Sequence, residues 1–472
     1  MAKKKLTLED ILVPKEDIPY EVPENWCWVK LGSIVNLERG ITFPASAKRS
    51  EMEDGLIPCL RTANVQNILK IDDLIYIDKS YIKQNINKLV REGDIIMSTA
   101  NSLELVGKLA IVENIHQEMT FGGFVLNIRN KGYINNKYLF YYLRGMFVLG
   151  EFQKIASQTT NIANINAKKI EDINIAIPPL AEQERIVNRV ESLFDKVDKA
   201  AGLVDEARDG FEKRRAAILE KAFSGELTKK WREENGVSDQ KIVNSSSENG
   251  YNIPESWSWT TVEDVMTVKG GKRLPKGEKL LDENTGFPYI KAGDLKRGTV
   301  LIDNLQYISK DIHEKIKNYY VNSGDVYITI VGACIGDVGV IPEELDGANL
   351  TENAAKLCPN ENLNSKFIAR YLSSNFAQVM LKSDIASATL GKLSLTKIKK
   401  FMVPLPPIEE QDEIVKVLEK ILNNEHNIID LIELDENISI IKKSILAKAF
   451  RGDLGSNDLD EESSFELLKS IL

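Results

Sequence analysis

The sequence is poor in the residues that build metal sites and disulfide frameworks. Its 472 residues include only four cysteines and three histidines, all far apart and with no CxxC spacing. This pattern excludes a thiolate zinc site and a disulfide scaffold, and it favours a reducing, cytoplasmic setting. No run approaches the roughly 18–20 apolar residues of a membrane span. The basic residues near the start precede no apolar segment, so a secretory signal is not expected either.

Signatures of catalysis are missing as well. The sequence contains no GxxxxGK[ST] to hold a triphosphate and no GxGxxG to hold a dinucleotide. The Pro-Pro segments at 178–179 and 406–407 lack the flanking amide and aromatic residues with which amino-methyltransferases hold a flipped base. We therefore expect a binding protein that has no catalytic residues, metal or cofactor of its own.

The formal net charge of −9 at first argues against nucleic-acid binding. Its distribution changes this interpretation, because residues 20–178 hold 18 Lys and Arg against 17 Asp and Glu. Residues 251–405 hold 19 against 18. The acidic excess lies in the connecting and terminal segments, and the two near-neutral blocks can carry local basic patches.

Three segments of the sequence occur twice, in the same order and at nearly the same offset. Val-Pro-Glu-Asn-Trp-Cys-Trp at 22–28 matches Ile-Pro-Glu-Ser-Trp-Ser-Trp at 253–259. Pro-Pro-Leu-Ala-Glu-Gln-Glu-Arg-Ile-Val at 178–187 matches Pro-Pro-Ile-Glu-Glu-Gln-Asp-Glu-Ile-Val at 406–415. Ile-Leu-Glu-Lys-Ala-Phe-Ser-Gly-Glu-Leu at 218–227 matches Ile-Leu-Ala-Lys-Ala-Phe-Arg-Gly-Asp-Leu at 445–454. The chain is therefore a duplication of a unit of about half its length.

Each repeat begins with a block of short apolar runs separated by Gly, Asn and Asp clusters, which predicts a mixed α/β domain. The expected strands are 74–77, 94–98, 109–112, 124–128 and 173–177 in the first repeat, and 300–303, 325–331, 338–341 and 401–405 in the second. A helix is expected in each block, over 136–149 and 365–381. The two Trp-x-Trp segments could stack on bases, but core anchoring is favoured, and the Gly-Asp pairs at 93–94 and 324–325 favour tight turns.

A long helix follows each block, opened by Pro-Pro with acidic residues in its first turn. Apolar residues recur at steps of three, four or seven along both helices, with a polar break at 423–427 in the second. Neither apolar seam can stay exposed to water, so we expect the two helices to pair with each other. The predicted organisation is an N-terminal segment 1–19, blocks 20–178 and 253–405, helical regions 179–228 and 406–455, a linker loop 229–252 and an acidic tail 456–472. The tail includes Phe-Glu-Leu-Leu at 465–468, which suggests a short amphipathic helix.

Polar and basic loops at matching places of the two repeats are the candidate DNA contacts. Lys and Arg beside Gly can bind phosphates, and Asn, Ser, Thr and Arg can hydrogen-bond base edges. The loops align while their side chains differ, as expected of two modules that read different sequences. For any single residue, a solvated loop is the alternative. The candidate DNA-binding residues are Arg39, Thr42, Lys48, Arg49, Arg61, Asn64, Ser98, Asn101, Thr160, Asn161, Asn164, Lys272, Arg273, Lys276, Lys291, Asp294, Thr329, Thr389, Lys392 and Ser394.

With its repeated Pro-Pro and Lys-Ala-Phe-x-Gly segments, the chain closely resembles the specificity subunit of type I restriction–modification enzymes over nearly its whole length. The resemblance implies two target recognition domains, each reading one half of a split DNA site. It also implies helical regions that pack as an antiparallel coiled coil, set the spacer and dock two adenine methyltransferase subunits. S-adenosylmethionine would lie on those subunits, and ATP and Mg on a nuclease subunit if one joins. The expected partner-binding residues are Glu182, Gln183, Phe223, Glu410, Gln411 and Phe450.

Two other functions fit parts of the sequence. A coiled-coil scaffold whose blocks bind protein would show no DNA affinity and no steep salt dependence. A stand-alone methyltransferase or nuclease would act as the purified chain, but its motifs are missing.

Overall fold

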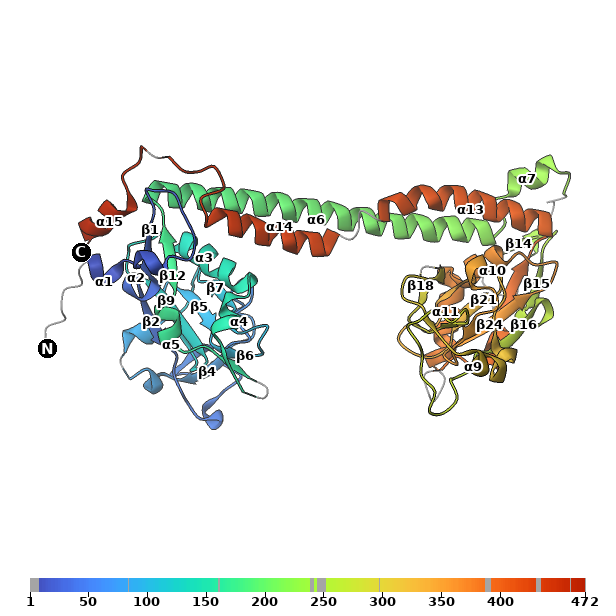
Figure 1. Cartoon of the computed structure of the whole chain (residues 1–472), viewed down its shortest axis with the longest axis horizontal. Helices are drawn as coiled ribbons and strands as arrows, with labels where there is room; N and C mark the ends of the chain where they lie inside the picture. The colour runs from blue at the N-terminus through green and yellow to red at the C-terminus, as the bar shows by residue number, and fades with distance from the viewer. Residues whose placement is uncertain are drawn as a thin grey trace. The chain divides into compact units, whose positions relative to one another are not determined.

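The chain forms two compact units, which are described separately (Figure 1). The computed structural model describes residues 8–471 except 84, 160–161, 238–241, 244–251, 297, 387–391, 430–433 and 459. Unit 1 comprises Met1–Leu203 and Glu433–Leu472, and unit 2 comprises Val204–Ile432. The units cut across the repeats, because each combines one block with helical segments from both halves of the sequence.

The block of unit 1 is built on a four-stranded antiparallel sheet with the order β2-β9-β5-β7. Its strands are β2 (Val35–Arg39), β9 (Val125–Asn130), β5 (Ile95–Ser98) and β7 (Leu109–Ile111). A strand pair and a three-stranded sheet accompany it: β1 (Cys27–Lys30) with β12 (Asn174–Ile177), and β4 (Ile75–Asp78), β3 (Leu56–Leu60) and β8 (Thr120–Phe121). Helix α3 (Asn136–Val148) follows the sheet.

The block of unit 2 repeats the topology of these three sheets. Its four-stranded sheet has the order β16 (Met266–Gly270), β24 (Ala354–Pro359), β21 (Val326–Thr329) and β22 (Val338–Val340). The other counterparts are β15 (Ser258–Thr261) with β25 (Met402–Leu405), β20 (Gln306–Tyr307), β17 (Pro288–Ile290) and β23 (Asn349–Leu350), and helix α10 (Ser365–Leu372). The duplicated mixed α/β architecture is confirmed.

Most predicted strands lie within one or two residues of their observed bounds, and two predictions in the second repeat were wrong. The strand expected over 300–303 is only the short β19 (Thr299–Val300), paired with β18 (Leu295–Lys296). The helix expected over 365–381 is two helices, α10 and α11 (Asn375–Ala386). The break lies at Ser374, whose buried hydroxyl accepts a hydrogen bond from the backbone N–H of Ala377 and so starts a new helix.

The first long helix, α6 (Leu180–Phe223), runs for 44 residues and contributes to both units. Where the sequence predicted one second helix, the structure describes two, α13 (Ile408–Ile429) and α14 (Leu434–Ala449), and the residues between them lie outside the described ranges. The polar break expected at 423–427 does not end α13. In unit 1 the chain after 433 runs antiparallel to the start of α6, because Lys442 pairs with Asp198 whereas Glu461 pairs with Arg185. In unit 2, α13 shares an apolar core with the end of α6.

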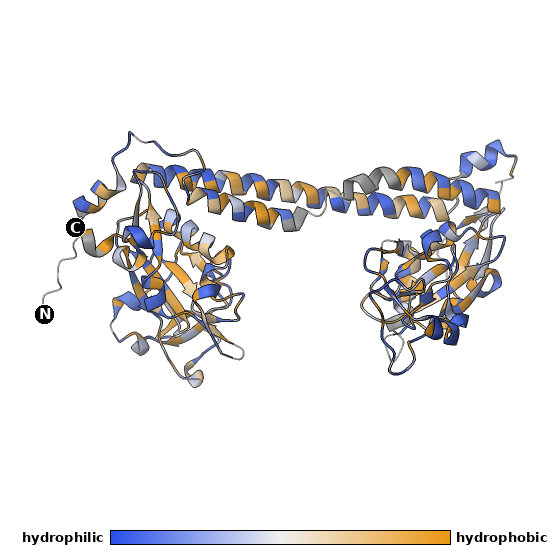
Figure 2. Cartoon of the chain, in the orientation of Figure 1, coloured by the Kyte–Doolittle hydropathy of each residue, from blue (hydrophilic) through white to orange (hydrophobic). Residues whose placement is uncertain are grey.

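Apolar packing inside each unit follows the predicted pattern. Figure 2 shows apolar residues concentrated on the strands of both blocks and alternating with polar residues along α6. Ile186 and Val190 of α6 are buried with Ile445 and Leu446 of α14, which confirms the predicted seam in unit 1. No helix in the described part of the chain has the length and hydropathy needed to cross a membrane. The described residues also hold no cluster of three or more His, Cys, Asp or Glu that could bind a metal ion.

Parts of the expected linker and tail are ordered. The linker forms α7 (Lys229–Glu234), and β13 (Ile242–Val243) pairs with β14 (Ile253–Pro254), so a plain loop over 229–252 was wrong. The amphipathic helix expected in the tail is α15 (Ser464–Ile471). Its Leu468 is buried in the core of unit 1, and the Ser464 hydroxyl donates to the backbone oxygen of Asn25 at 3.0 Å.

Candidate nucleic-acid interface

A cavity of about 500 Å³ opens on the block of unit 1 where three loops meet. Its walls come from the end of β2, the turn after β3 and the turn that precedes β9. Four predicted DNA-binding residues from separate parts of the sequence line it together. The lining residues are Arg39, Ile41, Thr42, Phe43, Lys48, Arg61, Thr62, Ile75, Gly122, Gly123, Phe124 and Val125.

Close backbone packing between glycines holds the two main walls of this cavity together. A Cβ atom at Gly40 would collide with the backbone oxygens of Gly122 and Phe121, so no other residue fits there without displacement. The adjacent Arg39 donates from Nε to the Gly123 oxygen at 3.3 Å. Thr99 donates from both its backbone N–H and its hydroxyl to the Phe124 oxygen. The 122–124 turn is therefore fixed at both ends.

The rim of the cavity is cationic. Arg39 and Lys48 are exposed, and neither forms an ion pair with a described residue. Arg61 pairs with Asp73 at 3.0 Å through Nη2, but its Nε is buried and has no acceptor among the described residues. Guanidinium and ammonium groups that have N–H donors left over in this way can donate hydrogen bonds to phosphate oxygens and to acceptors on base edges.

The block of unit 2 has the same backbone arrangement with different side chains. Gly271 packs against the backbone oxygens of Thr351 and Leu350, as Gly40 packs against its own partner turn. The ladder pairs Gly270 with Ala355, where unit 1 pairs Arg39 with Leu126. This register makes the 351–353 turn the counterpart of 122–124.

Three of the predicted cations of unit 2, Lys272, Arg273 and Lys291, have partners among the described residues. Lys272 and Arg273 are exposed, and Arg273 forms an ion pair with Glu352 through Nε at 2.5 Å. The Lys272 ammonium lies 5.4 Å from the centre of the Tyr319 ring. Lys291 donates from Nζ to Gln306 Oε1 at 3.1 Å.

Two residues predicted to bind DNA instead organise loops, and that assignment is corrected. The Asn64 carboxamide is buried, accepts from the Arg61 backbone N–H at 2.8 Å and donates to the backbone oxygens of Lys70 and Asp73. The Asp294 carboxylate is likewise buried and accepts from the Lys291 backbone N–H at 2.8 Å. These side chains close a turn, and their polar atoms face the backbone.

Two further predicted residues are buried inside strands and cannot reach DNA from there. Ser98 ends β5 and Thr329 ends β21, and both are almost completely inaccessible to solvent. They occupy equivalent positions, since Ser98 pairs with Val125 and Thr329 with Ala354. The sequence shows a polar residue at the end of each strand, but it does not show whether the side chain faces the solvent or the core.

The remaining candidates lie outside the cavity and stay predictions. Asn101 is half-buried and accepts from the Ser102 backbone N–H, and Ser394 caps α12 (Leu395–Lys399) by accepting from the Lys397 backbone N–H. The exposed candidates on other loops are Arg49, Asn164, Lys276 and Lys392. Thr160, Asn161 and Thr389 lie outside the described residues.

Sequence reasoning missed the two matched turns themselves. Phe124 is 66% exposed although its backbone is fixed, and Asn353 takes the equivalent place in unit 2. Thr62 at the cavity wall was also overlooked. The signal was present in the glycines at 40 and 271, whose partners only the strand register identifies.

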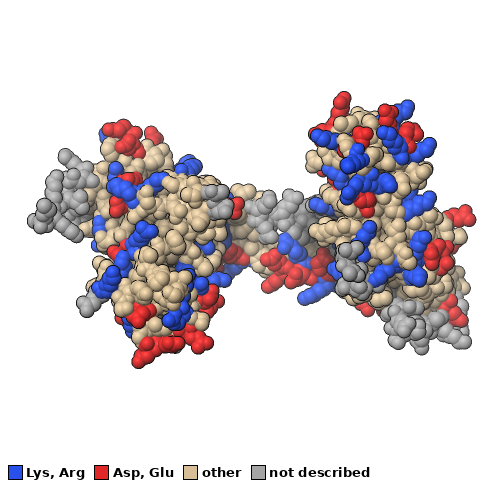
Figure 3. Space-filling view, turned by 90° about the horizontal axis from the view of Figure 1, so that it is seen from below, with Lys and Arg blue, Asp and Glu red and all other residues tan. Residues whose placement is uncertain are grey.

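The surface charge of each block agrees with this geometry. In the view of Figure 3, Lys and Arg gather on the face of unit 2 that lies away from its helices. On the corresponding face of unit 1, a broad uncharged area is bordered by Lys and Arg and, at two edges, by Asp and Glu. This face of each block thus includes a basic or an uncharged area in a protein whose net charge is −9.

The repeated sequence motifs meet one another in space at a junction between block and helices. In unit 1 the Trp26 indole donates from Nε1 to Glu182 Oε2 at 2.8 Å, and Phe450 packs edge-on against Tyr138 and Tyr142. Gly452 lies directly against Pro23. In unit 1, each of the three repeated segments is therefore in direct contact with another of them at this junction.

Unit 2 reproduces the junction with its own copies. Trp257 donates from Nε1 to Glu410 Oε2 at 2.9 Å, and Phe223 packs against Phe367 and Tyr371. Gly225 lies against Pro254. In each unit, the Lys-Ala-Phe-x-Gly segment comes from the other repeat.

The two buried glutamates have different neighbours. Glu410 pairs with the buried Arg232 of α7 at 2.5 Å and accepts from the Thr228 hydroxyl at 2.6 Å. Glu182 has neutral partners, with the Asn457 amide donating to its Oε2 at 2.9 Å. Burial raises the pKa of Glu182, and the hydrogen bonds from Trp26 and Asn457 partly oppose this.

The six residues predicted to bind partners belong to these junctions. Gln183 and Gln411 each accept from a backbone N–H in the block, of Asn135 and Asn364, and donate to a Pro oxygen. The side chains of Glu182, Gln183, Phe223, Glu410, Gln411 and Phe450 are all buried within this chain. In this structure these six side chains therefore join the block to the helices of each unit.

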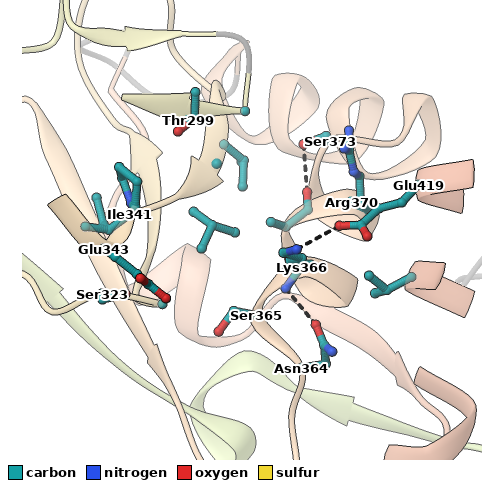
Figure 4. Close-up of a pocket in the computed structure, with 18 residues that line it drawn as sticks. Thr299, Ser323, Ile341, Glu343, Asn364, Ser365, Lys366, Arg370, Ser373 and Glu419 are labelled. Carbon is teal, nitrogen blue, oxygen red and sulfur yellow. Dashed lines mark hydrogen bonds and ion pairs between the residues drawn. The ribbon is translucent and has the colours of Figure 1, made fainter. Parts of the chain in front are cut away.

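Each unit also has a cavity where its block meets its helix. In unit 2 a cavity of about 680 Å³ lies between β22, α10 and α13, and Figure 4 shows Lys366 of α10 bonded to Glu419 of α13. The unit 1 counterpart, about 300 Å³, is lined by Lys137 and Glu191. Both Lys–Glu pairs measure 2.8 Å.

The two units together define a duplicated protein with paired, unlike recognition surfaces on a common backbone. The comparison with protein families agrees: the type I restriction modification DNA specificity domain matches residues 23–206 and 254–434. Because these matches cover most of the sequence, the chain belongs to that family.

Curated relatives are similar to the chain in sequence, and solved structures share its fold. The chain is 26% identical over 455 residues to the type I restriction enzyme EcoKI specificity subunit of Escherichia coli (strain K12), covering 92% of this chain and 90% of the relative. It is also 26% identical over 446 residues to the StySPI specificity subunit of Salmonella potsdam, with the same coverages. The crystal structure of the HsdS subunit from Thermoanaerobacter tengcongensis matches the fold with a TM-score of 0.52 and 20% identity, over 92% of this chain and 99% of that one. A structure from a study of type I R-M system assembly matches with a TM-score of 0.67 and 21% identity, over 92% and 100%.

Proposed function

We propose that this chain is the non-catalytic DNA-recognition subunit of a type I restriction–modification complex, and that each block reads one half of a bipartite DNA site. The observation that carries the proposal is the pair of matched turns. Two blocks with one backbone hold unlike side chains at 122–124 and 351–353, beside exposed cations. This is what two readers of different half-sites require, because phosphate contacts position a protein while base-edge contacts specify sequence.

The test is adenine methylation across the genome of the source cell, with and without the gene. We expect methylation to disappear at one motif made of two half-sites and a fixed unspecific gap. Exchanging 20–178 for the block of another specificity subunit should then change one half-site only. A simultaneous change in both halves would contradict independent readers. Unchanged methylation combined with no salt-sensitive DNA binding would favour the protein-binding scaffold instead.

We further propose that two copies of one methyltransferase subunit bind, one to each unit. The equivalent cavities beside the helices support this, since both are built from the same elements and keep a Lys–Glu pair while the reading turns differ. A surface that binds the same partner twice must stay alike in both repeats. The mass of the purified complex tests the stoichiometry, and a single bound copy would contradict it.

The cofactors of the proposed complex belong to its other subunits. S-adenosylmethionine would bind the methyltransferase subunits, and ATP and Mg a nuclease subunit if one joins. A cytoplasmic location follows from the proposed DNA substrate. Methyl transfer or DNA cleavage by the purified chain alone would contradict the proposal that catalysis belongs to the other subunits.

A further inference from the structure

The 122–124 turn exposes an aromatic ring on a backbone that cannot easily move. Phe124 is 66% exposed, yet its carbonyl oxygen accepts two hydrogen bonds from Thr99, at 2.9 and 3.0 Å. Val125 donates back to the Gly122 oxygen at 2.8 Å, and Gly40 packs directly against this turn because it has no Cβ atom. A large apolar side chain held in water on a fixed turn gains no burial free energy in the free protein, and a bound apolar surface would supply it. Because a single exposed apolar residue is ordinary, the residues around Phe124 must show whether such a surface binds here.

The surroundings of Phe124 identify that surface. The ring lies at the same cavity as Arg39, Lys48 and Arg61, so an occupant must present negative charge near an apolar group. An acidic protein segment has the required negative charge, but it would not explain why the two units carry the same turn with different side chains. The equivalent position in unit 2 carries Asn353, whose backbone oxygen accepts from Ile330 as that of Phe124 accepts from Thr99. Two turns with one backbone and different chemistry fit two different DNA sequences.

We propose that Phe124 is a specificity-determining residue that contacts the 5-methyl group of a thymine in the half-site read by unit 1. This inference rests on the proposed function. The thymine methyl is the one apolar group on the major-groove edge of a base pair, and Phe is among the side chains that contact it. Every half-site that is methylated on adenine contains an A·T pair and therefore offers such a methyl group. Asn353 instead presents a carboxamide, which forms hydrogen bonds with a base edge.

The experiment removes the methyl group and the ring separately and together. The complex of the full chain with its methyltransferase partner is titrated with duplexes in which each thymine of the unit 1 half-site is replaced by deoxyuridine. For the wild type we expect one position at which the loss of the methyl group weakens binding about fourfold, the factor that burial of one such group supplies. The variant Phe124→Ala should bind the thymine duplex more weakly and should not distinguish thymine from deoxyuridine there.

Asn353→Ala is the matched control. It should retain the full deoxyuridine effect in the unit 1 half-site and should change only the recognition of the half-site read by unit 2. Because Phe124 is exposed, its replacement should leave thermal unfolding unchanged, which separates a binding defect from misfolding.

Two results would overturn the inference while leaving the proposed function intact. One is a wild type that binds its split site but is insensitive to deoxyuridine at every position of the unit 1 half. The other is a Phe124→Ala variant that keeps the full deoxyuridine effect, or that loses a DNA bend without any thymine dependence, as a wedge between base steps would. A wild-type complex with no preference for any split site would instead reject the proposed function itself.

Discussion

Replacing Arg232 by Met tests the tertiary arrangement most directly, because this residue lies in a segment that composition alone predicted as a loop. Its guanidinium is buried, pairs with Glu410 at 2.5 Å and donates to the Gly225 backbone oxygen at 2.7 Å. Methionine fills a similar volume but leaves the Glu410 carboxylate buried without its cation. Breaking a buried pair by removing one partner costs about 3–5 kcal/mol. We expect a loss of that size in the free energy of unfolding of unit 2.

The natural comparison is unit 1, where the equivalent glutamate forms no ion pair with an arginine among the described residues. Glu182 receives hydrogen bonds from Trp26 and Asn457, and Arg185 lowers its pKa only through space, so a carboxylate can be buried at this junction without a directly paired arginine. Part of the cost should therefore be recovered when Arg232→Met is combined with Glu410→Gln, which removes the unpaired charge. A double-mutant cycle measures this recovery, which we expect to exceed about 1 kcal/mol.

Hydrogen exchange followed by mass spectrometry is the suitable assay, because a chain of two units need not unfold in one step. Peptides from α7 and β14 report on unit 2, and peptides from β1 and α15 report on unit 1. Exchange should accelerate in the first group only. A loss below about 1 kcal/mol, or equal loss of protection in unit 1, would refute the reasoning.

Three further predictions follow from the same geometry. Since burial raises the pKa of Glu182, the contribution of this group to the stability of unit 1 should be complete below the ordinary value of 4.5 and should be lost as pH rises through the folded value, and Glu182→Gln should remove this part of the pH dependence. Phe450→Ala removes a buried ring packed against Tyr138 and Tyr142 and should destabilise unit 1 by about 3–5 kcal/mol, measured by hydrogen exchange. Seven residues inserted in α6 after Leu203, matched by an insertion between α13 and α14, add about 10 Å of helix and should lengthen the methylated motif's gap by about three base pairs.

Each of these predictions has its own contrary result. A pH profile of unit 1 that Glu182→Gln leaves unchanged would assign the dependence to another group. Phe223→Ala is the control for Phe450→Ala, because it should destabilise unit 2 and spare unit 1. A gap of unaltered length in the insertion variant would show that the helices do not set the spacing.

Local patterns were sufficient to predict most of the secondary structure and the duplication. Three repeated segments in one order revealed the two halves, and period-two and period-3.6 apolar patterns placed the sheet strands and α6, because these periods depend only on neighbouring residues. The surface position of Arg39, Thr42 and Lys48 was also predictable, since they lie in polar and basic loops, but that they line one cavity with Arg61 depended on the tertiary structure.

Burial and partnership depended on segments far apart in the sequence. Asn64 and Ser98 have residue types suited to DNA contacts, yet one closes a turn and the other lies inside a sheet, because the face a side chain takes is set by what packs over it. The exposed position of Phe124 is likewise a result of tertiary packing, in which Gly40 contacts the backbone of Gly122 and the Phe124 ring stays in solvent.

The sequence by itself determined that the chain is a duplicated pair of α/β blocks and long amphipathic helices with unlike loops at like places. Only the tertiary structure decided that each unit takes its Lys-Ala-Phe-x-Gly segment from the other repeat, with Phe450 in unit 1 and Phe223 in unit 2. Either repeat's copy carries the same apolar ring and glycine, so local chemistry could not distinguish them. The choice follows from the antiparallel course of the helices, which brings the end of one repeat to the start of the other.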